Sequence, residues 1–296
     1  MSDAIVEIHR LSRRFGGKQA LDEITLRVER GTVFGLVGEN GAGKTTLIKH
    51  VLGLLKAQLG SVRVFKLDPV RDPVGVLGRI GYLSEDRDLP DWMTVAQLMR
   101  YNQAFFPRWD EKFAGQLQDQ FELDPKQQVK RLSRGQRARA GLLIALAHRP
   151  DLLILDEPSS GLDPVVRRDI LSAIIRTVAD EGRTVLFSSH LLDEVERVAD
   201  WVAFIHQGRV GLNSSLGDIL QSHRRLVLRF ETSQPARPNL PGVLSYDGEG
   251  REWTVLCNGG LEELRRAASN AGAQVVDEDT PTLDEIFLAR SRSSCV

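Results

Sequence analysis

Short apolar runs alternate with amphipathic stretches along most of the chain. Residues 5–8 and 24–28 alternate apolar and polar side chains with a period of two, which predicts short β-strands. Residues 33–37 form an apolar run that predicts another strand. Residues 152–155 are continuously apolar, which is typical of a strand buried on both faces of a parallel sheet. Further strands are expected at residues 60–65, 80–83, 184–187 and 201–206.

Apolar residues at helical spacing follow several of these strands. Asp163 and Pro164 supply an N-cap and a first-turn proline, so a helix is expected to begin there. Strands that alternate with helices predict an α/β core with a largely parallel sheet. The predicted helices are residues 47–55, 94–121 with an interruption at Pro107, 135–147, 164–181 and a helix that begins near Leu191.

The composition of the chain changes near residues 222–225. Two domains are therefore expected, a large one at residues 1–220 and a small α+β appendage at residues 221–296. Within the appendage we expect strands at 226–230, near 243–244, at 253–256 and at 274–276, a proline-rich turn at 234–241, and helices at 261–271 and 282–289.

Composition narrows the class of protein. A hydrophobic content of 42% suits a soluble globular protein, and a formal net charge of −1 gives no electrostatic case for a nucleic-acid partner. Cys257 and Cys295 lack metal-ligand spacing, which favours a reducing cytosol over a disulfide framework. The first residues do not have the pattern of a signal peptide, and the longest apolar stretch, 140–147, is too short to span a bilayer. We expect a cytoplasmic protein that reaches a membrane only through other subunits.

A glycine-rich loop follows the strand at 33–37 and fits the phosphate-binding pattern G-x-x-x-x-G-K-[ST]. Its glycines let backbone N–H groups point at a polyphosphate, and the following helix adds positive partial charge. Lys44 can reach the β- and γ-phosphates, and the Thr45 hydroxyl can ligate Mg²⁺. The strand–loop–helix setting favours this function over a simple turn. The loop consists of Gly38, Glu39, Asn40, Gly41, Ala42, Gly43, Lys44, Thr45 and Thr46.

Two carboxylates end the apolar run at 152–155. Asp156 can hold Mg²⁺, and Glu157 can align and polarise an attacking water. An apolar run that ends in Asp-Glu is by itself commonly a mere strand end. Its position after a phosphate loop favours the catalytic interpretation.

The segment 132–136 offers a second anion site. The Ser133 hydroxyl, the Gly135 backbone N–H and the helix N-terminus can all face an anion. The alternative is a capped surface helix.

These motifs, in this order, resemble the ATP-binding subunit of an ATP-binding-cassette (ABC) transporter over about residues 5–220. The resemblance implies a P-loop NTPase core with an antiparallel β subdomain and an α-helical subdomain at about residues 86–150. It makes residues 38–46 the Walker A loop, 152–156 Walker B and 132–136 the signature. The remaining residues that it assigns are Phe15 as an adenine platform, Glu157 as general base, Ser133, Gly135, Gln136 and Asp163 as further nucleotide contacts, and His190 as the γ-phosphate switch.

The chain departs from the family pattern at two positions. Glu85 stands where the family usually has Gln, and an ionised carboxylate can ligate Mg²⁺ but cannot donate a hydrogen bond to phosphate. Arg134 replaces a signature glycine, while Ser133 and Gly135 are intact. We expect nucleotide binding to survive both changes.

The resemblance implies an ATPase that uses ATP and Mg²⁺ to energise transport, and we expect export. It implies a head-to-tail dimer with a second copy or a paralogue, and an integral-membrane partner gripped by residues 86–121 on the cytoplasmic face. The expected catalytic residues are Lys44, Glu157 and His190, and the expected metal ligands are Thr45, Asp156 and Glu85. The alternative is a soluble ABC ATPase acting on ribosomes or DNA. A regulator that hydrolyses little is disfavoured by Glu157 and His190.

Overall fold

The computed structural model describes residues 3–179, 182–234 and 236–293. The chain divides into two compact units, Met1–Asn213 and Ser214–Val296. The boundary expected after residue 220 falls inside helix α8 (Leu216–Ser222), which belongs to the second unit. Ser215 caps α8 by accepting a hydrogen bond from the backbone of Asp218, so this short polar stretch forms a helix that apolar spacing did not indicate.

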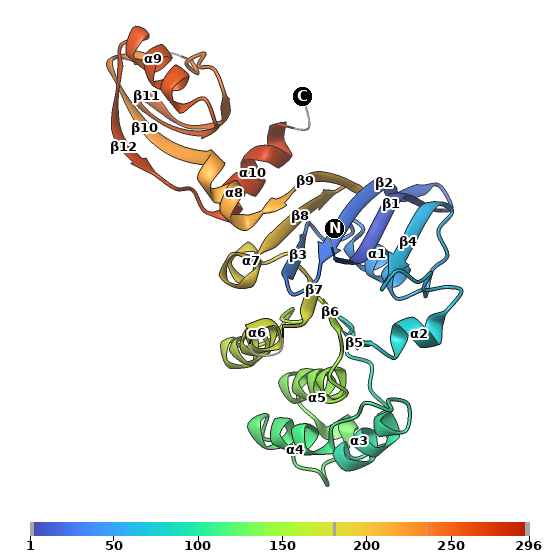
Figure 1. The fold of residues 1–296 in the computed structure, drawn as a ribbon. Helices are drawn as coiled ribbons and strands as arrows, with labels where there is room; N and C mark the ends of the chain where they lie inside the picture. Colours follow the sequence, from blue (N-terminus) through green and yellow to red (C-terminus); the bar gives the residue numbers. More distant parts are fainter. Residues whose placement is uncertain (1–2, 180–181, 235, 294–296) are drawn as a thin grey trace. The chain divides into compact units, whose positions relative to one another are not determined.

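A six-stranded sheet forms the centre of the first unit (Figure 1). Neighbouring strands from β5 to β8 are parallel, which confirms the predicted α/β core. Strand β9 was not predicted, because its sequence lacks a continuous apolar run. In spatial order the strands are β5 (Ile80–Leu83), β6 (Leu152–Asp156), β7 (Thr184–Ser189), β3 (Val33–Val37), β8 (Trp201–His206) and β9 (Arg209–Ser215).

A second, antiparallel sheet lies in the same unit. It has the order β2-β1-β4, with β1 at Ala4–Phe15, β2 at Lys18–Glu29 and β4 at Leu59–Val64. The strands β1 and β2 are longer than the alternating patterns indicated, because register shifts between them break the alternation. One hydrophobic core joins this sheet, the central sheet and helix α1 (Lys44–Val51). This core fixes the start of α1 against the central sheet.

A helical subdomain follows β5. The helical spacing predicted at 94–121, with its interruption at Pro107, corresponds to two helices, α3 (Val95–Gln103) and α4 (Glu111–Gln120), each with its own N-cap at Thr94 and Asp110. Pro107 lies in the connection between them. The other helices of this unit are α2 (Pro73–Leu77), which was not predicted, α5 (Arg134–Ala147), α6 (Pro164–Ala179), α7 (Leu192–Val198) and the 3₁₀ turn η1 (Val129–Arg131).

The second unit is an antiparallel sheet of order β11-β10-β12 with helices α9 (Leu261–Asn270) and α10 (Leu283–Ser293). Its strands are β10 (His223–Gln234), β11 (Val243–Asn258) and β12 (Ala273–Asp279). The strand pieces expected at 243–244 and 253–256 are parts of the single strand β11, which passes through Gly248 and Gly250 at positive φ angles of 125° and 62°. Cys257 is a buried free thiol, and Cys295 lies outside the described residues.

Candidate nucleotide site

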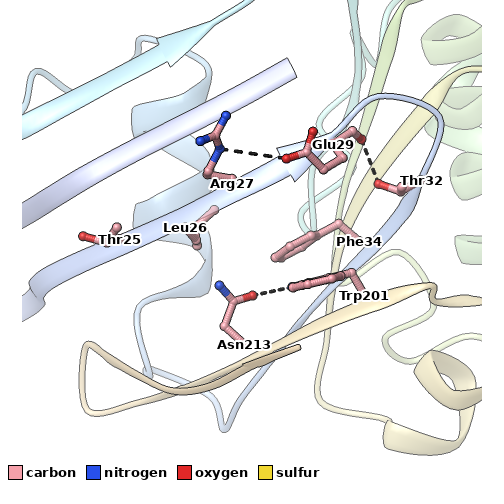
Figure 2. Close-up of a pocket in the computed structure, with 8 residues that line it drawn as sticks. All are labelled: Thr25, Leu26, Arg27, Glu29, Thr32, Phe34, Trp201 and Asn213. Atoms are coloured by element: carbon pink, nitrogen blue, oxygen red, sulfur yellow. Dashed lines mark hydrogen bonds and ion pairs between the residues drawn. The ribbon is translucent and has the colours of Figure 1, made fainter. Parts of the chain in front are cut away.

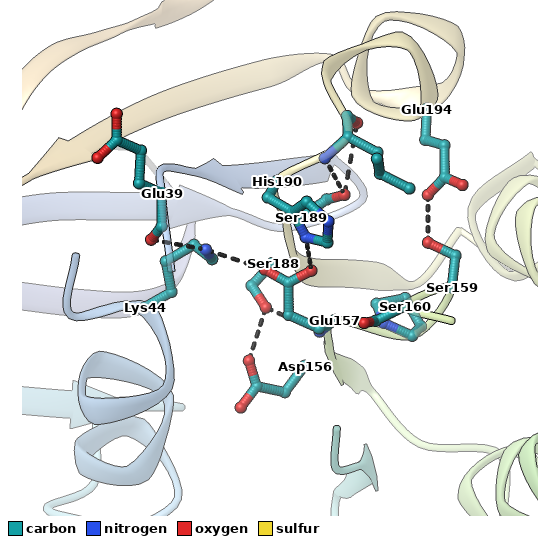
Figure 3. Close-up of polar contacts among 12 residues, drawn as sticks. Glu39, Lys44, Asp156, Glu157, Ser159, Ser160, Ser188, Ser189, His190 and Glu194 are labelled. Atoms are coloured by element: carbon teal, nitrogen blue, oxygen red, sulfur yellow. Dashed lines mark hydrogen bonds and ion pairs between the residues drawn. The ribbon is translucent and has the colours of Figure 1, made fainter. Parts of the chain in front are cut away.

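The predicted catalytic residues meet at one edge of the central sheet. Strands β3, β6 and β7 are parallel neighbours, so the loops at their carboxyl ends lie side by side. These loops carry Lys44, Glu157 and His190, which point toward one another in Figure 3. The sheet therefore brings Lys44 together with two residues that lie more than 100 positions later in the chain.

The phosphate loop depends on its glycines. Gly41 and Gly43 have φ angles of 81° and 115°, a region that favours glycine. A Cβ atom on Gly38 would lie 2.2 Å from the carbonyl oxygen of Ile205, and one on Gly43 would lie 2.6 Å from that of Ala20. Larger residues at these positions would force the loop away from its place before α1.

Lys44 is held inside this loop. Its Nζ donates hydrogen bonds to the carbonyl oxygens of Gly38, at 2.5 Å, and Glu39, at 3.2 Å. The same Nζ lies 2.9 Å from Oε1 of Glu157. The other oxygen of Glu157, Oε2, lies 2.7 Å from Nδ1 of His190. Glu157 thus links the ammonium group of Lys44 to the imidazole ring of His190.

The Glu157 side chain is set by an unusual backbone. The backbone φ angle of Glu157 is 47°, in the left-handed region that residues other than glycine seldom adopt. The Ser188 hydroxyl accepts a hydrogen bond of 2.9 Å from the Glu157 N–H. Only about 5% of the Glu157 side chain is exposed, so its burial is offset mainly by the ammonium group of Lys44 and by the hydrogen bond with His190.

Asp156 and Thr45 form the oxygen-rich part of the site. Ser188 donates a hydrogen bond of 2.6 Å to Oδ1 of Asp156, and the Thr45 hydroxyl also hydrogen-bonds to this carboxylate. Burial raises the pKa of Asp156, against the lowering effect of those two hydrogen bonds. A buried carboxylate beside a hydroxyl is a donor set that suits Mg²⁺, whose charge would compensate the burial. These two residues fit a bound Mg²⁺.

Ser188 was not among the predicted site residues. The structure places it directly opposite Asp156 in the parallel pair β6 and β7. Its position after the apolar run at 184–187 could have indicated a site residue, because the carboxyl ends of adjacent parallel strands lie at the same edge of a sheet.

The signature residues form a second group, at the start of α5. Ser133 caps α5, and its hydroxyl accepts a hydrogen bond from the Gln136 N–H at 3.2 Å, while the Gln136 side chain accepts one from the Ser133 N–H at 3.0 Å. Asp163 caps α6 by accepting from the Val165 and Val166 N–H groups. A Cβ atom on Gly135 would lie 2.8 Å from Cγ2 of Val166, so glycine permits this close approach of the two helices.

The two groups are separate within one chain. Among the described residues, no hydrogen bond or ion pair joins Ser133, Gln136 or Asp163 to the Lys44–Glu157–His190 set.

Phe15 and Glu85 lie at the surface of the first unit. Phe15 is 45% exposed, and the guanidinium of Arg13 lies 4.6 Å from its ring centroid. Glu85 is exposed in the loop after β5. Burial raises the pKa of Tyr82 to about 12, with further contributions from the negative charges of Asp156, Asp86 and Glu85.

A pocket of about 320 Å³ lies elsewhere in the first unit (Figure 2). Phe34, Trp201 and Asn213 line it together with residues of β2, and the Trp201 indole N–H donates a hydrogen bond to Asn213. Trp201 opens β8 and Thr32 precedes β3, so this pocket lies at the amino ends of these strands, away from the phosphate loop. It is not the nucleotide site.

Comparison with known proteins identifies the family of this chain. The model of the ABC transporter family matches residues 21–160. The daunorubicin resistance ATP-binding protein DrrA3 of Streptomyces coeruleorubidus is 33% identical over 306 aligned residues, which cover 97% of this chain and 96% of that protein. The chain belongs to the ABC transporter ATP-binding proteins. The ABC transporter ATP-binding protein YtrB of Bacillus subtilis is 27% identical over 97% of this chain and 98% of its own length.

Solved structures show the same fold. An ATP-binding subunit of an ABC transporter has a TM-score of 0.68 at 28% identity, over 73% of this chain and 92% of its own. The structure of cbiO1 from Clostridium perfringens, part of the ABC transporter complex cbiONQ, has a TM-score of 0.64 at 26% identity, over 74% of this chain and 91% of its own. The ABC ATPase fold is therefore confirmed, and the chain is an ATPase that binds ATP. Within the described residues, no helix is long and apolar enough to cross a membrane.

Proposed function

We propose that this ATPase energises an ABC exporter as a head-to-tail dimer with a second copy of itself or a paralogue. The observation that carries the proposal is the placement of Glu157 between Lys44 and His190, at 2.9 and 2.7 Å. The name of the relative DrrA3 refers to drug resistance, and that of another relative to bacitracin transport, which supports export.

The residues divide the chemistry among them. Lys44 binds the β- and γ-phosphates of ATP. These phosphates compete with Glu157 for the ammonium group of Lys44. Glu157, once free of this ion pair, accepts a proton from the attacking water. His190 orients the Glu157 carboxylate and donates a hydrogen bond toward the γ-phosphate. Thr45 and Asp156 would hold Mg²⁺, which when bound neutralises phosphate charge.

A dimer would complete the site. Ser133, Gly135 and Gln136 lie at the N-terminus of α5, where backbone N–H groups and the helix dipole favour an anion. Within the described residues, no hydrogen bond or ion pair joins them to Lys44 of the same chain, so a second chain would bring them to the γ-phosphate. Phe15, exposed beside Arg13, would stack on the adenine ring.

The helical subdomain would bind the integral-membrane partner. Trp92 is 72% exposed and Phe105 is 62% exposed, whereas the neighbouring Met93 is buried in the core. Tyr101 packs edge-on against Phe105, with ring centroids 5.1 Å apart. Exposed aromatic residues of this kind favour a protein–protein contact. The ATPase would then act as a peripheral protein on the cytoplasmic face of the membrane.

Replacement of Glu157 by glutamine tests the assignment of the base. Glu157→Gln should bind MgATP but lose turnover by about 10²- to 10⁴-fold in a phosphate-release assay. Steady-state hydrolysis at the wild-type rate would show that Glu157 is not the base.

A mixing experiment tests the dimer. A Ser133→Arg chain and a Lys44→Ala chain should each be inactive, while their mixture should regain part of the activity through one intact composite site. A mixture as inactive as its components would argue against a site shared between chains. Co-purification with a polytopic membrane protein, rather than with ribosomes or DNA, would separate the transporter from the soluble alternative.

A further inference from the structure

A buried arginine connects the loop after β5 to the loop after β6. Arg87 is 3% exposed, and its backbone has a φ angle of 51° at the end of a turn in which its N–H donates to the Ser84 carbonyl. Its Nη2 donates two hydrogen bonds, one of 3.0 Å to the carbonyl oxygen of Pro158 and one of 2.9 Å to that of Ser160. One nitrogen thus holds two carbonyl groups of the same segment.

The segment held by Arg87 directly follows the proposed base. Pro158 is the next residue after Glu157, whose left-handed backbone starts the turn, and the Ser160 N–H donates back to the Glu157 carbonyl at 3.2 Å. The same segment continues to Asp163 at the start of α6. Movement of residues 158–160 would therefore shift the Glu157 carboxylate.

Arg134 of the signature also reaches this segment. A Cβ atom built on Gly161 would lie 2.5 Å from Nη1 of Arg134, so the guanidinium rests against the backbone there. Burial and the nearby charge of Arg134 lower the pKa of Arg87, while Glu85 opposes this shift. A buried cation beside a second cation is costly, and its two carbonyl bonds offset that cost.

We propose that Arg87 is a positioning residue for ATP hydrolysis, which fixes residues 158–160 and through them the Glu157 carboxylate. This inference deepens the proposed function, because it rests on Glu157 as the base. Arg87 touches neither ATP nor the attacking water in this scheme. It acts on the catalytic rate and leaves nucleotide binding unchanged.

The chain offers a matched control at the opposite ends of the same two strands. Arg79 precedes β5, and its Nε donates a hydrogen bond of 2.7 Å to Asp151, which precedes β6. Its guanidinium also packs 3.8 Å from the ring centroid of Phe65. Arg79→Met therefore removes an arginine that joins β5 to β6 but leaves the loops at their carboxyl ends intact.

The test compares Arg87→Met, Arg87→Lys and Arg79→Met in the full-length protein. Arg87→Met should lower kcat by about 10- to 100-fold, since a displaced catalytic group is no longer aligned. Its KM for MgATP, and its Kd for MgATP by calorimetry, should stay within about twofold of wild type. Arg87→Lys keeps a cation with several donors and should restore part of kcat. Arg79→Met should keep the wild-type kcat even if it lowers the melting temperature.

Other outcomes would overturn the proposal. An unchanged kcat in Arg87→Met, a raised KM with unchanged kcat, or an equal loss of kcat in Arg79→Met would each do so. If Arg87→Met fails to fold, Arg87→Gln replaces it, because its shorter neutral side chain cannot span both carbonyl groups. Glu157→Gln is assayed beside these variants. Retained turnover in that variant would remove the proposed base, whereas wild-type turnover in Arg87→Met alone would refute only the role of Arg87.

Discussion

The ammonium group of Lys44 lies 2.9 Å from a carboxylate oxygen of Glu157, and about 5% of each side chain is exposed. The residue proposed to bind phosphate is therefore paired with the residue proposed to activate water. In the proposed function, the ATP phosphates would compete with Glu157 for this cation. Such competition would tie the release of the base to the arrival of the nucleotide.

Removal of the Lys44 ammonium should weaken nucleotide binding. Lys44→Ala loses the cation that faces the β- and γ-phosphates, so we expect the Kd for MgATP to rise by at least about tenfold in a calorimetric titration. Lys49→Ala is a suitable control, because Lys49 is exposed near the end of the same helix, α1. Equal affinity of the Lys44→Ala variant and the wild type would show that the loop at 38–46 is not the phosphate site.

The exposed carboxylate of Glu85 should affect the coupling of the ATPase to its membrane partner rather than the hydrolysis of ATP. Glu85→Gln restores the residue that the family usually carries, so we expect ATP binding and basal hydrolysis to persist. The larger change should appear when ATPase activity is compared with and without the membrane partner in a bilayer, because the loop of Glu85 leads into the helical subdomain. If Glu85→Gln abolishes basal hydrolysis as completely as Glu157→Gln, the assignment of the base must be revised.

The contact between Gly135 and Val166 should be measurable as a coupling. A methyl group on Gly135 would approach Cγ2 of Val166 to 2.8 Å, so Gly135→Ala should lower the free energy of unfolding by about 1–3 kcal/mol through overpacking. Val166→Ala makes room for that methyl group. In a double-mutant cycle by denaturant unfolding, the two changes together should cost less than the sum of each alone. Strict additivity would show that the helices do not meet as described.

Burial of His148 should make the first unit less stable in acid. Its ring is 1% exposed and stacked on Phe106, and burial lowers the pKa of His148 from 6.5 to about 4. Between these two pH values the unfolded chain binds a proton that the folded chain excludes. The free energy of unfolding should therefore fall by up to about 3 kcal/mol as the pH falls from 6.5 to 4.

The variant His148→Gln isolates this contribution. Burial also lowers the pKa values of His50 and His223. More than one histidine therefore contributes to the pH dependence of the free energy of unfolding in the wild type. In denaturant unfolding at several pH values, the free energy of unfolding should change less steeply with pH for His148→Gln than for wild type. Parallel slopes would mean that folding does not lower the pKa of His148.

Local pattern was sufficient for the elements that support the site. The buried strand at 152–155 and the glycine loop before Lys44 are continuous in the sequence, so their type and position could be predicted. Strand β11 was divided in the prediction because Gly248 and Gly250 interrupt its alternation. In the structure the strand is continuous, because it pairs with β10. The contacts of Arg87 could not be predicted, since they depend on how two loops far apart in the chain approach each other.

The same limit applies to the nucleotide site. Sequence order could name Lys44, Glu157 and His190 by resemblance, but the ion pair between the first two depends on the parallel packing of β3, β7 and β6. Ser188 follows the apolar run at 184–187, and its register with Asp156 places it in the site.

The second unit has a hydrophobic core made from its own residues, among them Leu226, Trp253 and Ala268. A segment with a hydrophobic core of its own can in principle fold independently of the rest of the chain. Evolution can therefore vary residues 214–296 at a pace of their own, while the geometry around Glu157 is retained. In this sense the chain is modular, and a chimaera that carries the second unit of a relative should keep its hydrolytic rate.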